Sequence, residues 1–159
     1  MSFAIDLGGN TALVTGAGQG VGRAIACALA SAGATVHVND LRDELTEDTI
    51  DTIRAAGGSA SSAPFDVTDY DAVQQVIGTI DPLDILVNNV ALGTLGDTEV
   101  DPDTGQLSDA DRKALSQYIV RRRGRPDDVA PMVTLLVSPL AEWITGQTIP
   151  VNGGYTVNL

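Results

Sequence analysis

Four glycines lie within seven residues in the stretch Thr15-Gly16-Ala17-Gly18-Gln19-Gly20-Val21-Gly22. This stretch falls between a short apolar run and a helical pattern. A diphosphate placed there would meet free backbone N–H groups and the positive end of a helix dipole. Glycines permit a tight turn and a close approach of ligand to backbone. A plain turn between a strand and a helix would have the same composition, so the motif needs support from its context.

A carboxylate supplies that context. Asp40 follows the next apolar run, 24 residues after Gly16. At this place a carboxylate can accept hydrogen bonds from a ribose 2′-OH, and it would repel a 2′-phosphate. The same side chain could instead cap the end of the strand or pair with Arg42. If the turn holds a dinucleotide, Asp40 favours NAD over NADP as the cofactor.

Apolar runs and amphipathic helices alternate along the first ninety residues. Strands are expected at 11–14, 35–38, 60–65 and 84–87. Helices are expected from the glycines to Gly33, over about 42–56, and after Thr68, which would cap a helix with Asp71 in capping-box position. Strands that are continuously apolar are typical of a parallel sheet covered on both faces. The predicted fold class is α/β, a Rossmann-like doubly wound parallel sheet.

The second half of the chain is less regular. Residues 93–111 are rich in glycine and acids without periodicity, which predicts a surface loop. A helix follows, with Asp128 as its N-cap and Pro131 in its first turn. Its core face is expected to comprise Val129, Met132, Val133, Leu136 and Val137. A final strand is expected at 148–151.

Composition excludes several classes of function. The chain has 159 residues and a net charge of −12, so nucleic acid is not an expected partner. The cluster 121–125 of four arginines is interpreted as a solvated helix end or as partners for nearby acids. Cys27 and His37 are each the only residue of their type, which excludes an intrachain disulfide and a His/Cys metal cluster. No apolar run would span a membrane and no secretory signal is recognised, so we expect a metal-free cytoplasmic protein.

The pattern Thr15-Gly16-x-x-x-Gly20-x-Gly22 resembles the nucleotide fingerprint of the short-chain dehydrogenase/reductase family. Asp66-Val67 resembles the family's adenine-contacting pair, and Asn88-Asn89-Val90-Ala91 is similar to its Asn-Asn-Ala-Gly motif. Residues 123–129 and 144–154 resemble its last helix and last strand. The resemblance implies cofactor contacts from Gly16, Gln19, Gly20, Val21, Gly22, Asp40, Asp66, Val67 and Asn88. It also implies one domain over 1–159, with a nucleotide-binding half at 1–90, a segment like the family's substrate loop at 91–120, and a C-terminal helix and strand at 121–159.

The family's catalytic pair has no counterpart in this sequence. Family members transfer hydride with a Tyr-x-x-x-Lys pair assisted by a serine, because a phenol is a poor base at neutral pH unless a nearby cation stabilises its anion. The chain has one lysine, Lys113, and Asp109 stands four residues before it. Tyr118, followed by Arg121 and Arg122, is a weak substitute, since arginine cannot relay a proton. No catalytic residue is therefore assigned, and weak or no hydride transfer is expected.

The chain is about ninety residues shorter than a typical family member. Residues 87–94 fit two family motifs at once, which suggests an internal deletion that removes the fifth strand and the Tyr/Lys helix. The fourth strand, with Ile85, Leu86 and Val87, then becomes an edge. The last strand could pair with it, giving the order 3-2-1-4-7, or remain unpaired. An exposed edge also predicts a non-standard homo-oligomer.

Three functions follow from this sequence. The first is an oxidoreductase by descent that keeps the adenosine and pyrophosphate part of its NAD site and lacks its active centre. The second is a non-enzymatic module that senses nucleotide or binds a partner through the sheet edge. The third is an active dehydrogenase that uses unorthodox groups or is completed by another polypeptide. Nothing in the sequence predicts the substrate.

Overall fold

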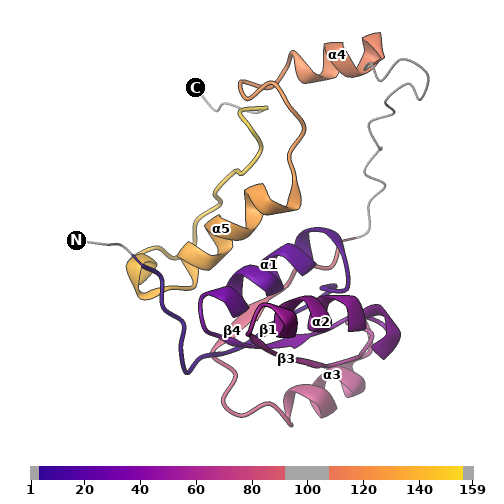
Figure 1. Cartoon of the computed structure of the whole chain (residues 1–159), viewed down its shortest axis with the longest axis vertical. Coiled ribbons are helices and arrows are strands. Elements are labelled where there is room, and N and C mark those ends of the chain that lie inside the picture. Colours follow the sequence, from indigo (N-terminus) through magenta and orange to yellow (C-terminus); the bar gives the residue numbers. More distant parts are fainter. Residues whose placement is uncertain (1–3, 92–107, 156–159) are drawn as a thin grey trace. The chain divides into compact units, whose positions relative to one another are not determined.

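The computed structural model describes residues 4–91 and 108–155 (Figure 1). The chain divides into two compact units. The first comprises Met1–Val90 with Pro126–Gln147, and the second comprises Ala91–Arg125 with Thr148–Leu159. The assignment of 1–159 to a single domain stays a prediction.

A parallel sheet of four strands lies at the centre of the first unit. Its order is β3 (Ser59–Ser62), β2 (Thr35–Val38), β1 (Thr11–Val14) and β4 (Ile85–Val87). Val14 pairs with Val38 on one side and with Val87 on the other, so three strands end at the same level. The four strands lie where the apolar runs predict them, although β3 ends three residues earlier.

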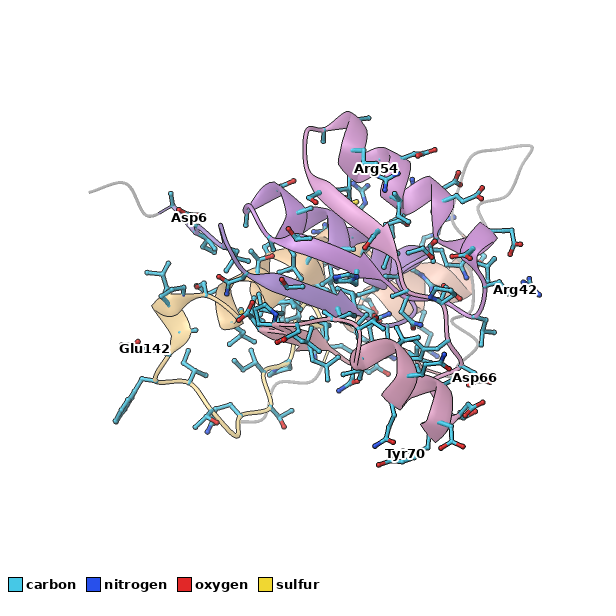
Figure 2. The ribbon with its side chains drawn as sticks, turned by 90° about the horizontal axis from the view of Figure 1, so that it is seen from below. Asp6, Arg42, Arg54, Asp66, Tyr70 and Glu142 are labelled. Carbon is cyan, nitrogen blue, oxygen red and sulfur yellow. The ribbon has the colours of Figure 1, made fainter. Side chains whose placement is uncertain are left out.

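Helices cover both faces of this sheet. One face carries α1 (Gly20–Ser31), α2 (Glu47–Ala55) and α5 (Pro126–Leu136), which share a core with Val36 and Ile85. The opposite face carries α3 (Tyr70–Ile77), which packs near Leu13 and Phe65 (Figure 2). The 3-10 helices η1 (Asp43–Leu45) and η2 (Pro139–Ala141) complete the unit. The predicted α/β class with helices on both faces is confirmed.

Two predicted helix starts are wrong. The cap of α3 is Asp69 and not Thr68, because the Asp69 carboxylate accepts hydrogen bonds from the N–H groups of Asp71 and Ala72. Helix α5 begins at Pro126, where a missing N–H costs nothing, so Pro131 lies inside the helix and not in its first turn.

The face of α5 that is most deeply buried carries small side chains. Ala130 and Thr134 are its buried residues, whereas Val133 and Val137 are half-buried at the border of the core. Small residues let the axes of α5 and α1 approach closely. The apolar stripe predicted as the core face is therefore only partly covered.

The predicted last strand is also wrong. Residues 148–151 form no strand, and the order β3-β2-β1-β4 ends at β4. A strand is stable only when its backbone groups are paired, and Pro150 has no N–H to donate. Just beyond this segment, the Gly153 carbonyl accepts a hydrogen bond from the N–H of Val120 at 2.9 Å.

The second unit contains α4 (Asp109–Leu115) and a pair of tyrosines. The rings of Tyr118 and Tyr155 lie 5.0 Å apart between centroids. The predicted loop over 93–111 is too long at its end, because α4 already begins at Asp109. Residues 93–107 of this predicted loop lie outside the described residues. Within 4–91 and 108–155, none of the helices is both long and apolar enough to cross a membrane.

Candidate dinucleotide site

The turn between β1 and α1 depends on its glycines. Gly16 and Gly20 have φ values of 60° and 58°, in the left-handed region that favours glycine. A Cβ on Gly22 would lie 2.3 Å from the carbonyl oxygen of Gly16, closer than any side chain tolerates. The first turn of α1 can therefore pack directly on the preceding loop only with glycine at position 22.

Helix α1 begins with backbone N–H groups that have no acceptor within the helix. Gln19 is the N-cap of α1 and makes no capping hydrogen bond with its side chain. The bond from the Arg23 N–H to the Gln19 carbonyl is at 3.2 Å, so the N–H groups of Gly20, Val21 and Gly22 precede the first full turn. Such groups have no acceptor within the helix and carry the positive end of its dipole. An anion is the natural ligand for this helix end.

Residues at the end of β2 hold the earlier part of the turn. The Gly16 N–H donates to Asn39 Oδ1 at 3.3 Å, and the Ala17 N–H donates to the Asn39 carbonyl at 2.7 Å. The Gly18 N–H donates to Asp40 Oδ2 at 3.1 Å. The N–H groups of residues 16–18 are thus used within the protein, and a ligand is left with those that follow.

Asp40 lies at the predicted place, after β2 and beside the glycine turn. Its Oδ1 accepts a second hydrogen bond from the Leu41 N–H at 2.9 Å. The nearby Arg42 pairs with Glu44 at 4.0 Å, and both of those side chains are exposed. Each carboxylate oxygen has two lone pairs, so Asp40 can still accept a ribose hydroxyl.

Asp66 follows β3 and lies at the same end of the sheet as Arg42 (Figure 2). Val67 is the next residue in the chain. The backbone N–H of Thr68, together with its hydroxyl, donates to Asp66 Oδ1 and lowers the pKa of that carboxyl group. Val67 and Leu41 are 37% and 61% exposed, so apolar side chains flank this edge. Flat apolar ligand groups can pack against such side chains.

Asn89, and not Asn88, contacts the glycine turn. Its side-chain amide donates to the carbonyl oxygens of Thr15 at 2.9 Å and Gly16 at 3.1 Å. Its backbone N–H donates to the Thr15 hydroxyl, which in turn donates to the Val87 carbonyl. Asn88 is exposed beside it. The doubled asparagine was the sequence signal, but the sequence did not show which member turns inward.

Asn39 is a second residue that sequence reasoning missed. Its side chain is 1% exposed, and its amide donates to the carbonyls of Ala63 at 3.0 Å and Phe65 at 3.1 Å. It therefore connects the loop after β3 to the glycine turn. The sequence signal that could have indicated this role is a polar residue directly after an apolar strand.

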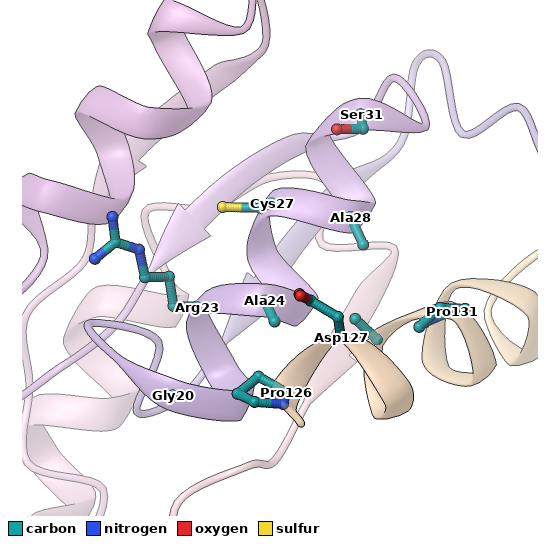
Figure 3. A pocket seen from close by; sticks show the side chains of 10 residues that line it. Gly20, Arg23, Ala24, Cys27, Ala28, Ser31, Pro126, Asp127 and Pro131 are labelled. Atoms are coloured by element: carbon teal, nitrogen blue, oxygen red, sulfur yellow. The ribbon is translucent and has the colours of Figure 1, made fainter. Parts of the chain in front are cut away.

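A separate pocket of about 550 Å³ lies between α1 and α5 (Figure 3). Its lining includes Ala24 and Cys27 of α1 and Asp127 and Ala130 of α5. Burial raises the pKa of the Cys27 thiol, with the nearby Arg23 acting in the opposite direction. A thiol whose pKa is raised is a weaker nucleophile at neutral pH than a free cysteine.

Catalytic and metal-binding groups were not predicted. Among residues 4–91 and 108–155 no cluster of three metal-ligating side chains occurs. Tyr118, the weak substitute for a catalytic phenol, is half-buried with its ring against Tyr155. The contact between Tyr118 and Tyr155 is a packing contact.

The glycine turn, the following helix and Asp40 lie in a stretch that matches a known family. The family model described as short chain dehydrogenase matches residues 10–119. The chain belongs to the short-chain dehydrogenase family. A second model, described as Enoyl-(Acyl carrier protein) reductase, matches residues 96–156.

Similar proteins include members of this short-chain dehydrogenase family from fungi, bacteria and animals. A short chain dehydrogenase of Pseudocercospora fijiensis is 36% identical over 154 residues, covering 87% of this chain and 50% of that protein. Gluconate 5-dehydrogenase of Gluconobacter oxydans is 42% identical over 91 residues, which are 55% of this chain and 36% of that one. L-xylulose reductase of Mus musculus is 39% identical over 92 residues, which are 57% of this chain and 36% of that protein. The chain thus spans half or less of the length of these short-chain dehydrogenase relatives.

Solved structures of the short-chain dehydrogenase type share the fold. A hydroxysteroid dehydrogenase from Escherichia coli has a TM-score of 0.72 at 22% identity, covering 94% of this chain and 97% of that one. A short-chain type dehydrogenase/reductase from Mycobacterium marinum has a TM-score of 0.78 at 22% identity, and the match covers 96% of this chain and 97% of that one. At this identity the likeness concerns the fold.

Proposed function

We propose that this chain is an NAD-binding member of the short-chain dehydrogenase family that transfers hydride weakly or not at all on its own. The observation that carries the proposal is the start of α1. There the N–H groups of Gly20 and Val21 have no helical acceptor, while those of residues 16–18 are taken by Asn39 and Asp40. This arrangement supports a diphosphate site at the N-terminal end of α1.

The residues present fit the adenosine and diphosphate parts of NAD. The N–H groups of Gln19, Gly20 and Val21 would hold the diphosphate. Asp40 would accept the ribose hydroxyls and repel a 2′-phosphate, which favours NAD over NADP. The exposed side chains of Leu41 and Val67 would offer apolar contacts to the base.

NAD supplies a nicotinamide ring that accepts a hydride when it is bound. This chain offers no Tyr-x-x-x-Lys pair to remove the accompanying proton from an alcohol, since Lys113 is preceded by Asp109 at that spacing. Loss of a positioned general base costs about 10²–10⁴ in rate. We therefore expect binding without efficient turnover.

Absorbance at 340 nm during incubation with NAD and a panel of alcohols tests this proposal, together with a calorimetric titration of ADP-ribose. The proposal predicts heat of binding with ADP-ribose and at most a slow rise in absorbance above the protein-free control. Sustained turnover by the purified chain would refute the proposal that it transfers hydride weakly or not at all. Absence of any ADP-ribose binding would refute the dinucleotide site.

The edge of the sheet supports a second candidate, a module that binds a partner. Among the described residues β4 is the edge strand of the sheet, and Leu86 at its centre is 48% exposed. A second copy of this chain is the proposed occupant, because two identical edges can pair antiparallel about a two-fold axis. Light scattering should then show a dimer at high concentration that Leu86→Lys reduces to a monomer. Equal masses for both proteins would exclude this candidate.

A further inference from the structure

Thr49, in the first turn of α2, connects that helix to the glycine turn. Its side chain is fully buried, and its hydroxyl shares its one proton between the carbonyl oxygens of Ala17 at 3.0 Å and Gly18 at 3.2 Å in a three-centre hydrogen bond. The two residues that accept these bonds are more than thirty positions earlier in the chain. This hydroxyl is therefore a tertiary contact and not a local cap of α2.

The hydroxyl completes the hydrogen bonding of the turn. Ala17 and Gly18 already donate their N–H groups to the carbonyl of Asn39 and the carboxylate of Asp40. With Thr49 on their carbonyls, both polar groups of each residue are satisfied within the protein. A buried polar group without a partner is costly, so this arrangement fixes which way the two peptide groups face.

The direction of these carbonyls matters for an anionic ligand. A carbonyl oxygen turned toward a diphosphate would repel it, whereas an N–H group attracts it. Thr49 holds the two oxygens on the α2 side of the turn. The N–H groups of the next residues, Gly20 and Val21, are then left for the ligand.

We propose that Thr49 is a positioning residue for diphosphate binding: its hydroxyl orients the peptide groups of Ala17 and Gly18 so that the turn presents donors and no acceptors to the ligand. The inference rests on the proposed dinucleotide site. It adds a residue of α2 that lies outside the glycine motif and does not touch the ligand.

The chain provides a matched control in the same helix start. Thr46 is the same residue type, is equally buried and precedes Thr49 by three positions. Its hydroxyl donates to the Asp43 carbonyl at 2.8 Å and to the Ser62 hydroxyl at 2.9 Å, and neither acceptor belongs to the glycine turn. Loss of this hydroxyl should affect folding without reorienting the turn.

The test measures ADP-ribose affinity by calorimetry and the thermal midpoint for the wild type, Thr49→Val, Thr49→Ser and Thr46→Val. The inference predicts that Thr49→Val weakens ADP-ribose binding by about tenfold, the effect of one poorly satisfied buried group. Thr49→Ser should bind within about threefold of the wild type because it keeps the hydroxyl. Thr46→Val should lower the midpoint while leaving the affinity within about twofold.

Equal affinity in Thr49→Val and the wild type would overturn the inference, and so would an equal loss in Thr46→Val. If Thr49→Val fails to fold, Thr49→Ala replaces it, because the space it leaves lets a water satisfy part of the turn. The loss there should be smaller than in Thr49→Val, about fivefold, because the water only partly replaces the Thr49 hydroxyl. A wild-type chain that does not bind ADP-ribose at all would overturn the proposed function and this inference together, and the other outcomes affect only the role of Thr49.

Discussion

Leu13 of β1 and Leu86 of β4 are direct neighbours in the parallel register, yet Leu13 is fully buried and Leu86 is 48% exposed. Leu13 packs with Phe65 and Ile80 in the cluster that includes residues of α3. The cover that α3 provides therefore ends between two adjacent strands. In the part of the chain that the structure describes, Leu86 is thus only half covered beside a well-packed core.

Substitutions at these two leucines should differ widely in their effect on the free energy of unfolding. Leu13→Ala is expected to cost about 2–5 kcal/mol, since it opens a cavity in the core. Leu86→Lys should change stability by no more than about 0.5 kcal/mol, as expected of a surface site. Urea unfolding at low protein concentration measures both. A large loss in Leu86→Lys would mean that another surface covers this leucine in solution.

Gly22→Ala should damage the candidate site more than an alanine elsewhere. The new Cβ would lie 2.3 Å from the Gly16 carbonyl oxygen and 2.6 Å from the side-chain nitrogen of Asn89. We expect a loss of about 1–3 kcal/mol from this overpacking, together with loss of ADP-ribose binding. Gly124→Ala is the control, because a Cβ there meets nothing within 4 Å. Similar thermal midpoints for the two variants would contradict the tight packing of α1 on the turn.

Asp40→Asn should alter the choice between cofactors. The substitution removes the negative charge and keeps one oxygen for the Gly18 N–H, while the amide nitrogen replaces the oxygen that accepts from the Leu41 N–H. Loss of that second bond affects both ligands alike, so the ratio of their affinities is the readout. Affinity for 2′-phospho-ADP-ribose should rise relative to ADP-ribose by about tenfold, the effect of about 1.4 kcal/mol of relieved repulsion. Asp43→Asn, at a carboxylate that accepts from the Ser62 hydroxyl, is the matched control and should leave the ratio unchanged. An unchanged ratio in Asp40→Asn would remove the basis for preferring NAD.

Stability should fall in mild acid through His37. This half-buried side chain of β2 has its Nδ1 at 3.0 Å from the Ser61 hydroxyl, and burial lowers its pKa below the ordinary 6.5. The unfolded chain then takes up a proton at a higher pH than the folded chain, so the free energy of unfolding decreases as the pH falls through 6.5. Thermal midpoints between about pH 7.5 and pH 5.5 should drop less in His37→Gln than in the wild type. An equal drop would show that other groups cause the acid sensitivity.

Periodic features of the sequence were sufficient for the fold class and for the location of the glycine turn. The strands at 11–14 and 35–38 match exactly, because buried parallel strands are continuous apolar runs. Helix starts were harder. Thr68 was predicted to cap α3, but the adjacent Asp69 caps it, because the local backbone conformation and not the residue type decides between two neighbours that can both cap.

Contacts between distant segments were not predictable from spacing. Asn39, Asn89 and Thr49 reach the glycine turn from β2, from the end of β4 and from α2. Each is a polar residue in an apolar or amphipathic context, a pattern with many possible explanations until the elements are assembled. The strand expected at 148–151 failed for a related reason, since strand formation requires a neighbour that the sequence pattern cannot supply.

We propose that this chain keeps the diphosphate site and lacks the groups that engage the nicotinamide and its substrate. Side-by-side calorimetric titration of the purified chain with NAD and with ADP-ribose tests it most directly. Equal dissociation constants, within about threefold, are the predicted result, because the nicotinamide half of NAD would add no favourable contact. NAD binding about tenfold tighter than ADP-ribose binding, or more, would contradict the claim. An additional free energy of binding of about 1.4 kcal/mol would require a working nicotinamide pocket.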